Sequence, residues 1–206
     1  MLELYFSPLA CSLASRIALL EAGVDARYQR VDLVSRRLVG HDGDFLAVSP
    51  KGQVPVLRLD DGSLLTEGSA VLQYIADLNP AAGLAPPPRD PQRYRLQEWL
   101  SFVGTELHKG FLHPAFNPAP EDMRAYARER VPKTLAIAAA HLDANAYLVG
   151  DSFSVADAYL VWALMLVHYA GIDLKAWPSL LAYQERGLGR ASVREALACE
   201  RPMLKQ

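Results

Sequence analysis

Residues 49–69 read SPKGQVPVLRLDDGSLLTEGS, and this stretch does most to decide the fold. Residues 56–59 and 63–66 flank Asp61-Gly62, which is a strong two-residue turn signal, so we predict that both segments are strands. An apolar helix follows directly, beginning at Glu67. The stretch therefore predicts a β-hairpin that leads into a helix.

The same stretch also carries backbone groups that suit a ligand. Pro55 stands at the head of the first strand, where a proline cannot donate to the ladder, so the N–H and C=O of Val54 are available to an extended ligand. The N–H groups around Glu67 and Gly68 open the helix and suit a carboxylate. Two interpretations are open here: an ordinary hairpin with its helix, or a site that binds a peptide backbone with a charged end.

The N-terminal segment predicts a strand, a helix and a second strand. Residues 2–6 are the first strand, a helix begins at Cys11 and ends near Gly23, and residues 28–33 are the second strand. This short spacing is typical of a parallel unit with a right-handed crossover. Together with the hairpin and the following helix, it gives a thioredoxin-like layout in which Cys11 lies at a helix N-terminus.

Proline-rich sequence separates this half of the chain from the rest. Residues 79–91 hold five prolines, which is typical of a semi-rigid linker. We predict an α/β plus all-α protein with a thioredoxin-like domain over 1–79, a linker over 80–91 and an all-helical domain over 92–206. The helices of the last domain are expected at 92–116, 121–146, 154–170, 176–189 and 191–199.

One helix start in this second half has a clear signature. Ser154 is followed three residues later by Asp157, which predicts an N-cap with a reciprocal acid. The helix that it opens is almost entirely apolar, so we assign the pair a structural role.

Composition narrows the class of protein. Of 206 residues, 51% are hydrophobic and 21% charged, and the net charge is −2, which argues against a nucleic-acid partner or an acidic membrane surface. No apolar run reaches membrane-spanning length. The cysteines are Cys11 and Cys199, and two lone cysteines fit a reducing compartment, so we expect a cytoplasmic protein. The histidines do not combine with acids at metal-ligand spacing, and we predict no metal.

Five segments, in order along the chain, carry a family resemblance. They are YFSPLACSL at 5–13, LQYIAD at 72–77, EWL at 98–100, TELHKG at 105–110 and FSVADAY at 153–159. With these segments the chain resembles the cytosolic glutathione S-transferases, and most of all their bacterial beta class. The resemblance spans essentially the whole chain.

The resemblance implies an enzyme that uses glutathione as co-substrate and acts as a homodimer. Glutathione would lie along Val54-Pro55, its γ-glutamyl carboxylate would meet the N–H groups at Glu67-Gly68, and its sulfur would approach Cys11. The resemblance further implies that the Val54–Pro55 peptide bond is cis. A small hydrophobic electrophile would enter from the helical domain, near His108, Phe111, Phe116 and His168.

Cys11 is the main candidate for chemistry. Oriented N–H groups at a helix start favour the thiolate, which is the reactive form. The alternative is a buried and inert cysteine. Any redox cycle would be monothiol, because Ala14 stands where a dithiol motif has its second cysteine. In place of Cys11, a hydroxyl of Tyr5, Ser7 or Ser12 could hydrogen-bond the glutathione sulfur. We interpret Tyr5 as a packing residue.

The helix around Trp99 supplies the second set of candidates. At the α-helical angle, Ser101, Thr105 and His108 share one stripe, which is either solvated or directed at the site, whereas Trp99, Phe102 and Val103 lie opposite. The match at 105–110 implies that His108 and Lys109 face the cysteine. His108 would then donate to a thiolate or move a proton, and Lys109 would attract a carboxylate.

The predicted catalytic residues are therefore Cys11 and His108. The residues predicted to bind glutathione are Arg36, Lys51, Val54, Pro55, Glu67, Gly68, Ser101, Thr105, Glu106 and Lys109. The chain departs from the beta-class pattern at Ser101, where asparagine is frequent, and at Arg36, where lysine is frequent. Arg16 replaces a frequent histidine and receives no role.

Three functions are compatible with this pattern. The first is conjugation of glutathione to an electrophilic carbon, and the second is glutathione-dependent thiol–disulfide exchange through Cys11. The third is non-catalytic carriage of hydrophobic compounds, which would need neither Cys11 nor His108.

Overall fold

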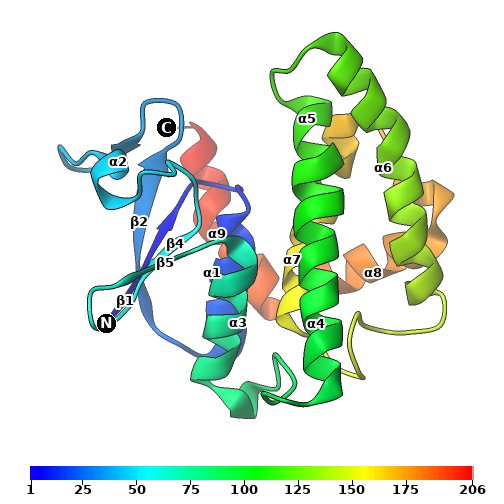
Figure 1. Cartoon of the computed structure of the whole chain (residues 1–206), viewed down its shortest axis with the longest axis horizontal. Coiled ribbons are helices and arrows are strands. Elements are labelled where there is room, and N and C mark those ends of the chain that lie inside the picture. Colours follow the sequence, from blue (N-terminus) through cyan, green and yellow to red (C-terminus); the bar gives the residue numbers. More distant parts are fainter. Residues whose placement is uncertain (206) are drawn as a thin grey trace. The chain divides into compact units, whose positions relative to one another are not determined.

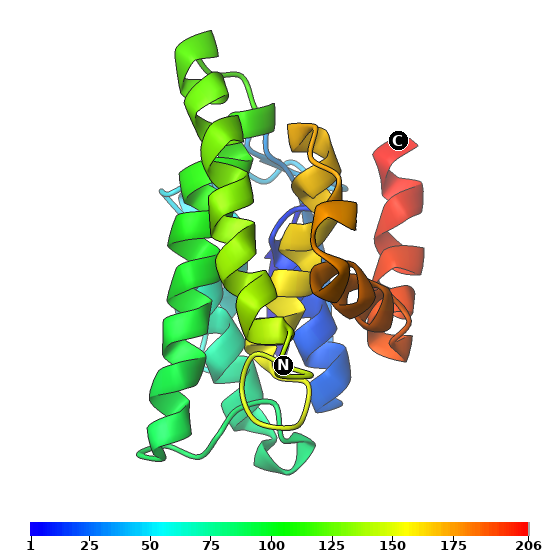
Figure 2. The ribbon, with the colours of Figure 1, turned by 90° about the vertical axis from the view of Figure 1, so that its right-hand side faces the viewer.

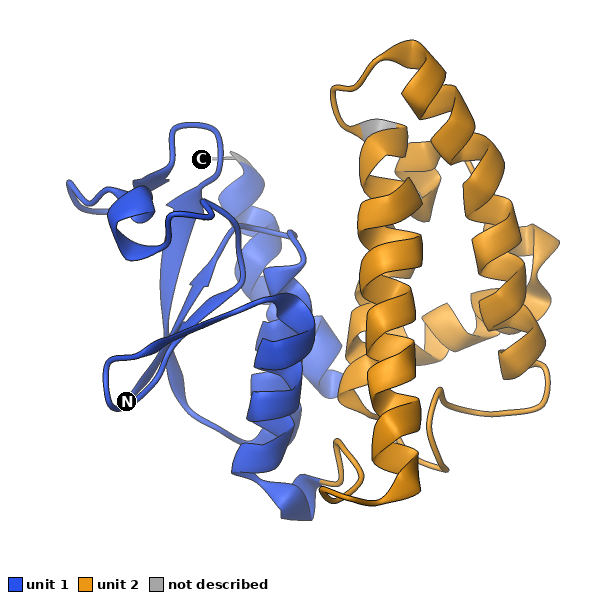
Figure 3. Cartoon of the chain, in the orientation of Figure 1, with its two compact units in different colours: residues 1–82, 191–206 blue, residues 83–190 orange. Residues whose placement is uncertain are grey.

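A computed structural model describes residues 1–205, without the side chains of Phe116 and Lys205. The chain forms two compact units (Figure 3): unit 1 is Met1–Ala82 with Ala191–Gln206, and unit 2 is Gly83–Arg190. The division at 82/83 falls inside the predicted linker. The predicted helical domain, 92–206, needs a correction at its end, because the last helix belongs to unit 1.

Unit 1 is built on a five-stranded mixed sheet with the strand order β3-β2-β1-β4-β5. The strands are β1 (Leu2–Phe6), β2 (Ala26–Asp32), β3 (Arg37–Leu38), β4 (Val56–Arg58) and β5 (Leu64–Thr66). β1 and β2 run parallel and the other neighbours run antiparallel. The parallel unit and the hairpin are confirmed, whereas the short strand β3 was not predicted.

Helices cover both faces of this sheet. The helices α1 (Ser12–Ala22) and α3 (Gly68–Leu78) lie on one side, and the short α2 (Phe45–Val48) lies on the other (Figure 1). Leu4 and Leu57 are paired across β1 and β4 and are completely buried. α9 (Ala191–Glu200) packs against α1, and η5 (Arg201–Lys205) ends the described chain.

Unit 2 is helical. Its elements are α4 (Pro91–Ser101), η2 (Phe102–Leu112), α5 (His113–Phe116), α6 (Glu121–Leu142), α7 (Val155–Leu166), η3 (Val167–Ala170), η4 (Leu174–Ala176) and α8 (Pro178–Leu188). Figure 2 shows α4 and η2 running beside α6. The first ten residues of α7 are all buried, so this helix is the centre of the unit's core.

The start of α7 has the predicted capping box. Ser154 Oγ accepts from the N–H of Asp157, and the Asp157 carboxylate accepts in turn from the N–H of Ser154. Asp157 also accepts from the hydroxyl of Tyr183 and from the N–H of Leu148. Burial raises the pKa of this carboxyl. The box therefore joins α7 to α8 and to the loop before it.

η2 is a π-helix of 11 residues, where the sequence predicted ordinary α-helix. Pro114 lies in the turn after it, and a proline in a helix has no N–H to donate and crowds the carbonyl four residues earlier, which favours a wider local register. Gly110 accommodates the wide turn, since a Cβ there would stand 2.4 Å from the carbonyl oxygen of Thr105. In the described chain, no helix is long and apolar enough to cross a membrane.

Candidate functional site

The thiol of Cys11 lies at the start of α1, against the loop that precedes β4. Cys11 is the N-cap residue of α1 and is partly buried. Its Sγ donates to the carbonyl oxygen of Val54 over 3.1 Å, and the Val54–Pro55 bond that follows is cis, as predicted. The fold thus brings together two predicted site residues that are 43 positions apart in the sequence.

Hydrogen bonds between Ser7 and Ser12 join the two ends of the loop that contains Cys11. The hydroxyl of Ser12 accepts from the N–H of Ser7 and donates to the carbonyl of the same residue. In the middle of the loop, the N–H of Leu9 donates to Glu200 over 2.8 Å. The hydroxyl of Ser12 is therefore already engaged within the loop, and its side chain is fully buried.

Glu200 is the residue of this region that sequence reasoning missed. It is completely buried, and its other carboxylate oxygen accepts from Arg16 over 2.7 Å. The guanidinium of Arg16 also stacks over Tyr28, with 3.7 Å between Cζ and the ring centroid. Burial raises the pKa of Glu200, although Arg16 and the N–H of Leu9 oppose that shift. Arg16 had been given no role, and the separation of 184 residues left no local signal.

Tyr5 is a packing residue, as interpreted from the sequence. Its ring belongs to the buried cluster that includes Phe45 of α2. Its hydroxyl donates to Glu3 over 2.7 Å and accepts from Arg58 over 2.7 Å. Burial raises the pKa of this phenol. The hydroxyl is thus held by two neighbouring side chains of the sheet.

Glu67 and Gly68 open α3 as expected. Glu67 is the N-cap and has an unusual backbone φ of 68°, and Gly68 is the first helical residue. Lys51 binds both the carboxylate of Glu67 and the hydroxyl of Thr66. The guanidinium of Arg36 donates to the carbonyl of Gly52, one residue after Lys51. Unit 1 therefore holds two cations and a helix N-terminus among the predicted binding residues.

Among the described residues, three of the four non-glycine positions with a positive φ lie in unit 1. Leu9, Arg36 and Glu67 all have a positive φ, between 57° and 68°, although none of them is glycine. Such conformations cost free energy and cluster at binding and catalytic sites. All three residues belong to segments already singled out, which supports this region as a site.

In unit 2, His108 is buried and forms a hydrogen bond with Tyr159 of α7. Its Nδ1 lies 2.8 Å from the hydroxyl of Tyr159, and its ring meets Trp162 edge-on with 4.6 Å between centroids. Burial, with help from the charge of Lys109, lowers the pKa of His108 from 6.5 to about 3. The imidazole is therefore neutral near physiological pH.

The prediction that Ser101, Thr105 and His108 share one face of this helix is wrong. Ser101 and Thr105 are exposed, whereas His108 is only 5% exposed. A π-helix turns less per residue than an α-helix, so His108 rotates away from the side of Ser101. The hydroxyl of Thr105 donates to the carbonyl of Ser101. Glu106 and Lys109 are exposed like Ser101.

The residues expected near the electrophile are spread over unit 2. Phe111 of η2 contacts the ring of Tyr126. His168 lines a cavity of about 420 Å³ next to η4 and α8. The side chain of Phe116 lies outside the described part of the structure.

The described residues show no cluster of metal-ligating side chains. Among them, no group of three histidine, cysteine or acidic side chains is arranged to hold one.

Comparisons with known proteins agree with this geometry. The family model described as "Glutathione S-transferase, N-terminal domain" matches residues 10–78, and the one described as "Glutathione S-transferase, C-terminal domain" matches residues 99–190. Glutathione S-transferase GstA of Escherichia coli O157:H7 is 42% identical over 200 residues, covering 97% of this chain and 98% of the relative.

Solved structures give the same result. A sphingomonad glutathione S-transferase in complex with glutathione is 46% identical with a TM-score of 0.92, and the match covers 96% of this chain and 98% of the other. The bacterial beta class enzyme of Sphingomonas chungbukensis is 43% identical, also with a TM-score of 0.92 and with the same coverage. With both domain models matched and near-complete relatives above 40% identity, the chain belongs to the glutathione S-transferase family.

Proposed function

We propose that the protein binds glutathione on unit 1 and conjugates it, through a new bond from its sulfur, to an electrophilic carbon of a small hydrophobic compound. One observation carries the proposal: the thiol of Cys11 lies 3.1 Å from the carbonyl of Val54, at the start of α1. A bound peptide that pairs with the backbone of Val54 would bring its own cysteine to this point. The sphingomonad relative was solved in complex with glutathione, which supports the choice of ligand.

The remaining contacts to glutathione follow from its charges. The γ-glutamyl carboxylate meets the N–H groups at Glu67 and Gly68, where α3 begins and its dipole favours an anion. The cations Arg36 and Lys51 lie on the same unit and suit the glycine carboxylate.

His108 acts in this proposal as a neutral group. A proton shuttle works best with a pKa near the working pH, whereas burial lowers the pKa of His108 to about 3. Its Nδ1 is hydrogen-bonded to the hydroxyl of Tyr159, so a hydrogen bond to a substrate would use Nε2 on the opposite edge of the ring. We therefore assign His108 a hydrogen-bonding role and no proton transfer.

Thiol–disulfide exchange is the second candidate function. The protein has its own thiol, Cys11, at the start of α1, and this thiol can form a mixed disulfide with glutathione. The thiolate of Cys11 would attack the glutathione sulfur of a mixed disulfide, forming Cys11–S–S–glutathione and releasing the other thiol. A second glutathione thiolate would then attack this bond, which yields oxidised glutathione and regenerates the thiolate of Cys11. In the described chain the other cysteine, Cys199, is a free and exposed thiol.

Two broader features belong to the same proposal. The protein works in the cytoplasm, and it forms a homodimer as the resemblance implies. Sedimentation velocity at micromolar concentration tests the second point: the dimer mass is the expected result, and a monomer at all concentrations contradicts it.

Calorimetry with reduced glutathione tests the proposal itself. We expect saturable binding with a dissociation constant between about 1 µM and 1 mM, or about −8 to −4 kcal/mol. Because the proposed contacts need both carboxylates of the tripeptide, its diethyl ester should bind at least about tenfold more weakly. Absence of binding at several millimolar glutathione would remove both enzymatic candidates and leave only the carrier.

A further inference from the structure

The loop before Cys11 contains a turn whose backbone conformation is unfavourable for leucine. Residues 7–10 close a β-turn, in which the N–H of Ala10 donates to the carbonyl of Ser7 over 3.0 Å. Leu9 is the third residue of this turn and has a φ of 57°, and a proline precedes it. A proline second and a positive φ third are typical of a type II turn, where glycine is the usual third residue. Leucine keeps such a conformation only where the surrounding structure stabilises it.

Glu200 supplies a stabilising contact from the other end of the chain. Its Oε2 accepts from the N–H of Leu9 over 2.8 Å, and its Oε1 accepts from Nε of Arg16 over 2.7 Å. Leu9 stands two residues before Cys11, and Arg16 stands five residues after it. One carboxylate of α9 therefore fixes the chain on both sides of the thiol.

The carboxylate of Glu200 is itself held in place by buried neighbours. The guanidinium of Arg16 lies over the rings of Phe6 and Tyr28, with Cζ 4.6 Å and 3.7 Å from their centroids. Glu200 has an exposed fraction of 0%, so it cannot contact glutathione directly. Any effect of this residue on the chemistry must pass through the loop that it binds.

A displaced loop would change the position of the reacting sulfur. Sγ of Cys11 lies 3.1 Å from the carbonyl oxygen of Val54, and the influence of the helix N–H groups on a thiolate is confined to the first turn. A shift of about 1 Å in a reacting group can cost about 100-fold in rate. The N–H groups proposed to bind the γ-glutamyl carboxylate belong to the start of α3 instead. Loss of the Glu200 contact should therefore slow the reaction at Cys11 more than it weakens glutathione binding.

We propose that Glu200 is a positioning residue for the thiol of Cys11 and acts through the N–H of Leu9. This role rests on the function proposed above, because Cys11 must be the residue at the glutathione sulfur. Arg16 holds the carboxylate of Glu200 in place, and its own part is indirect.

Two double variants separate the contact with Leu9 from the buried ion pair. Arg16→Met with Glu200→Gln keeps an acceptor oxygen for the N–H of Leu9, whereas Arg16→Met with Glu200→Met does not. Both variants remove the ion pair completely, so neither leaves an unpaired buried charge. Every protein in the comparison, including the reference chain, also carries Cys199→Ser, which leaves Cys11 as the reacting thiol.

The readout is the rate at which oxidised glutathione modifies Cys11, followed by mass spectrometry. The thiolate of Cys11 attacks one sulfur of oxidised glutathione, forms Cys11–S–S–glutathione and releases reduced glutathione. We expect the Glu200→Gln double variant to react within about threefold of the reference rate and the Glu200→Met double variant at least about tenfold more slowly. Calorimetry should show that both variants bind reduced glutathione within about threefold of the reference dissociation constant.

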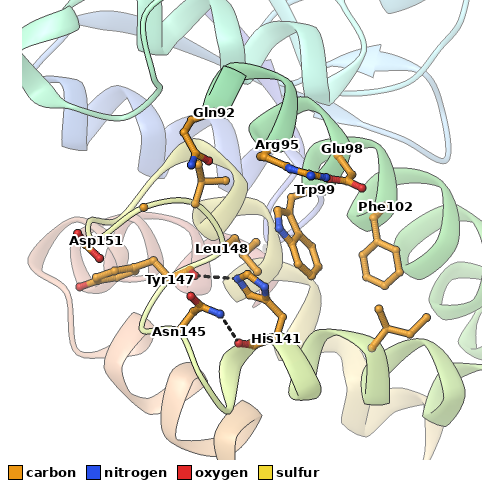
Figure 4. A pocket seen from close by; sticks show the side chains of 13 residues that line it. Gln92, Arg95, Glu98, Trp99, Phe102, His141, Asn145, Tyr147, Leu148 and Asp151 are labelled. Carbon is orange, nitrogen blue, oxygen red and sulfur yellow. Dashed lines mark hydrogen bonds and ion pairs between the residues drawn. The ribbon is translucent and has the colours of Figure 1, made fainter. Parts of the chain in front are cut away.

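A matched control removes an exposed ion pair from unit 2. Arg95 and Glu98 of α4 are paired over 2.8 Å, and they lie among the side chains that line a cavity of about 530 Å³ (Figure 4). Both side chains are more than half exposed. Arg95→Met with Glu98→Met should leave the rate of Cys11 modification unchanged.

Equal rates for the two Glu200 variants would overturn this role, whether both match the reference or both are slow. If either variant fails to fold, the α-hydroxy analogue of leucine at position 9 tests the same contact, because it removes the N–H and keeps every side chain. That protein should react at least about tenfold more slowly, and an unchanged rate would overturn the role.

The reference chain separates this role from the function on which it rests. A reference chain that binds no glutathione at several millimolar would remove the proposed function, and the positioning role with it. A reference chain that binds glutathione but whose Cys11 is not modified by oxidised glutathione would overturn the positioning role alone.

Discussion

At the scale of single residues, His108 shows most clearly how burial sets chemistry. Its ring is enclosed by Tyr159 and Trp162, and the charge of Lys109 further disfavours protonation. A histidine on this helix would act as an acid or base if it were solvated, but this one is held neutral. The sequence showed that a histidine was present and could not show its burial.

Protonation of His108 should make stability depend on pH. Burial lowers the pKa of the folded state to about 3 from 6.5, so between these values the unfolded chain binds a proton that the folded chain does not. The free energy of unfolding contributed by this group is thus fully present above pH 6.5 and falls as pH drops towards 3. Urea unfolding at several pH values should show a shallower decline for His108→Phe. Equal slopes for the two proteins below pH 6.5 would contradict the assignment.

Features of the structure that have a local signal could be predicted from the sequence. Cys11 before an apolar helix, Pro55 at a strand start and Ser154 three residues before Asp157 each act within a few positions. Glu200 could not be found in this way, since its partners lie at the other end of the chain.

At the scale of elements, the capping box at the start of α7 is the best-supported local feature. Ser154→Ala removes the side-chain acceptor for the N–H of Asp157 and should lower the free energy of unfolding by about 0.5–2 kcal/mol. Activity per folded molecule should be unchanged. A loss of activity at unchanged stability would show that Ser154 has a functional role instead.

The π-helix η2 makes a separate prediction at Gly110. A methyl group there would approach the carbonyl of Thr105 to 2.4 Å, and because that oxygen belongs to the backbone the helix itself must shift. Gly110→Ala should therefore destabilise unit 2, despite the higher helix propensity of alanine. The exposed Ala140 of α6 offers the reverse control, since Ala140→Gly should cost only about 1 kcal/mol from propensity. Stabilisation of the chain by Gly110→Ala would argue for an ordinary α-helical register.

Helix positions were predictable from apolar periodicity, whereas the register within η2 was not. Periodicity arguments assume about 3.6 residues per turn, and a π segment breaks this assumption without a sequence mark of its own. The prediction of a polar stripe through Ser101 and His108 was wrong for that reason. The two-residue strand β3 was missed because so short a segment has no detectable alternation.

At the scale of the whole molecule, the last helix belongs with the first domain. Arg16 of α1 and Glu200 of α9 form a buried ion pair, and the same carboxylate binds the loop before Cys11. The sequence predicted α9 correctly as a helix but assigned it to the helical domain. Its helical pattern gives no information about which unit it packs on.

Breaking this pair should destabilise unit 1 strongly. Glu200→Ala leaves Arg16 charged and buried and the N–H of Leu9 without its acceptor, so we expect a loss of about 3–5 kcal/mol. Glu129→Ala, which breaks the exposed pair with Lys133, is the control and should change stability little. Equal effects of the two substitutions in thermal unfolding would contradict the role given to α9.

The most direct test of the central claim is a paired assay of Cys11→Ala at saturating glutathione. The claim is that this thiol lies at the glutathione sulfur, and alanine cannot form the mixed disulfide. Reduction of a small mixed disulfide should therefore collapse. Conjugation of a generic aryl halide should survive at least in part, since bound glutathione keeps its own sulfur and the N–H groups of α1 remain. Both activities at the wild-type level would contradict the claim.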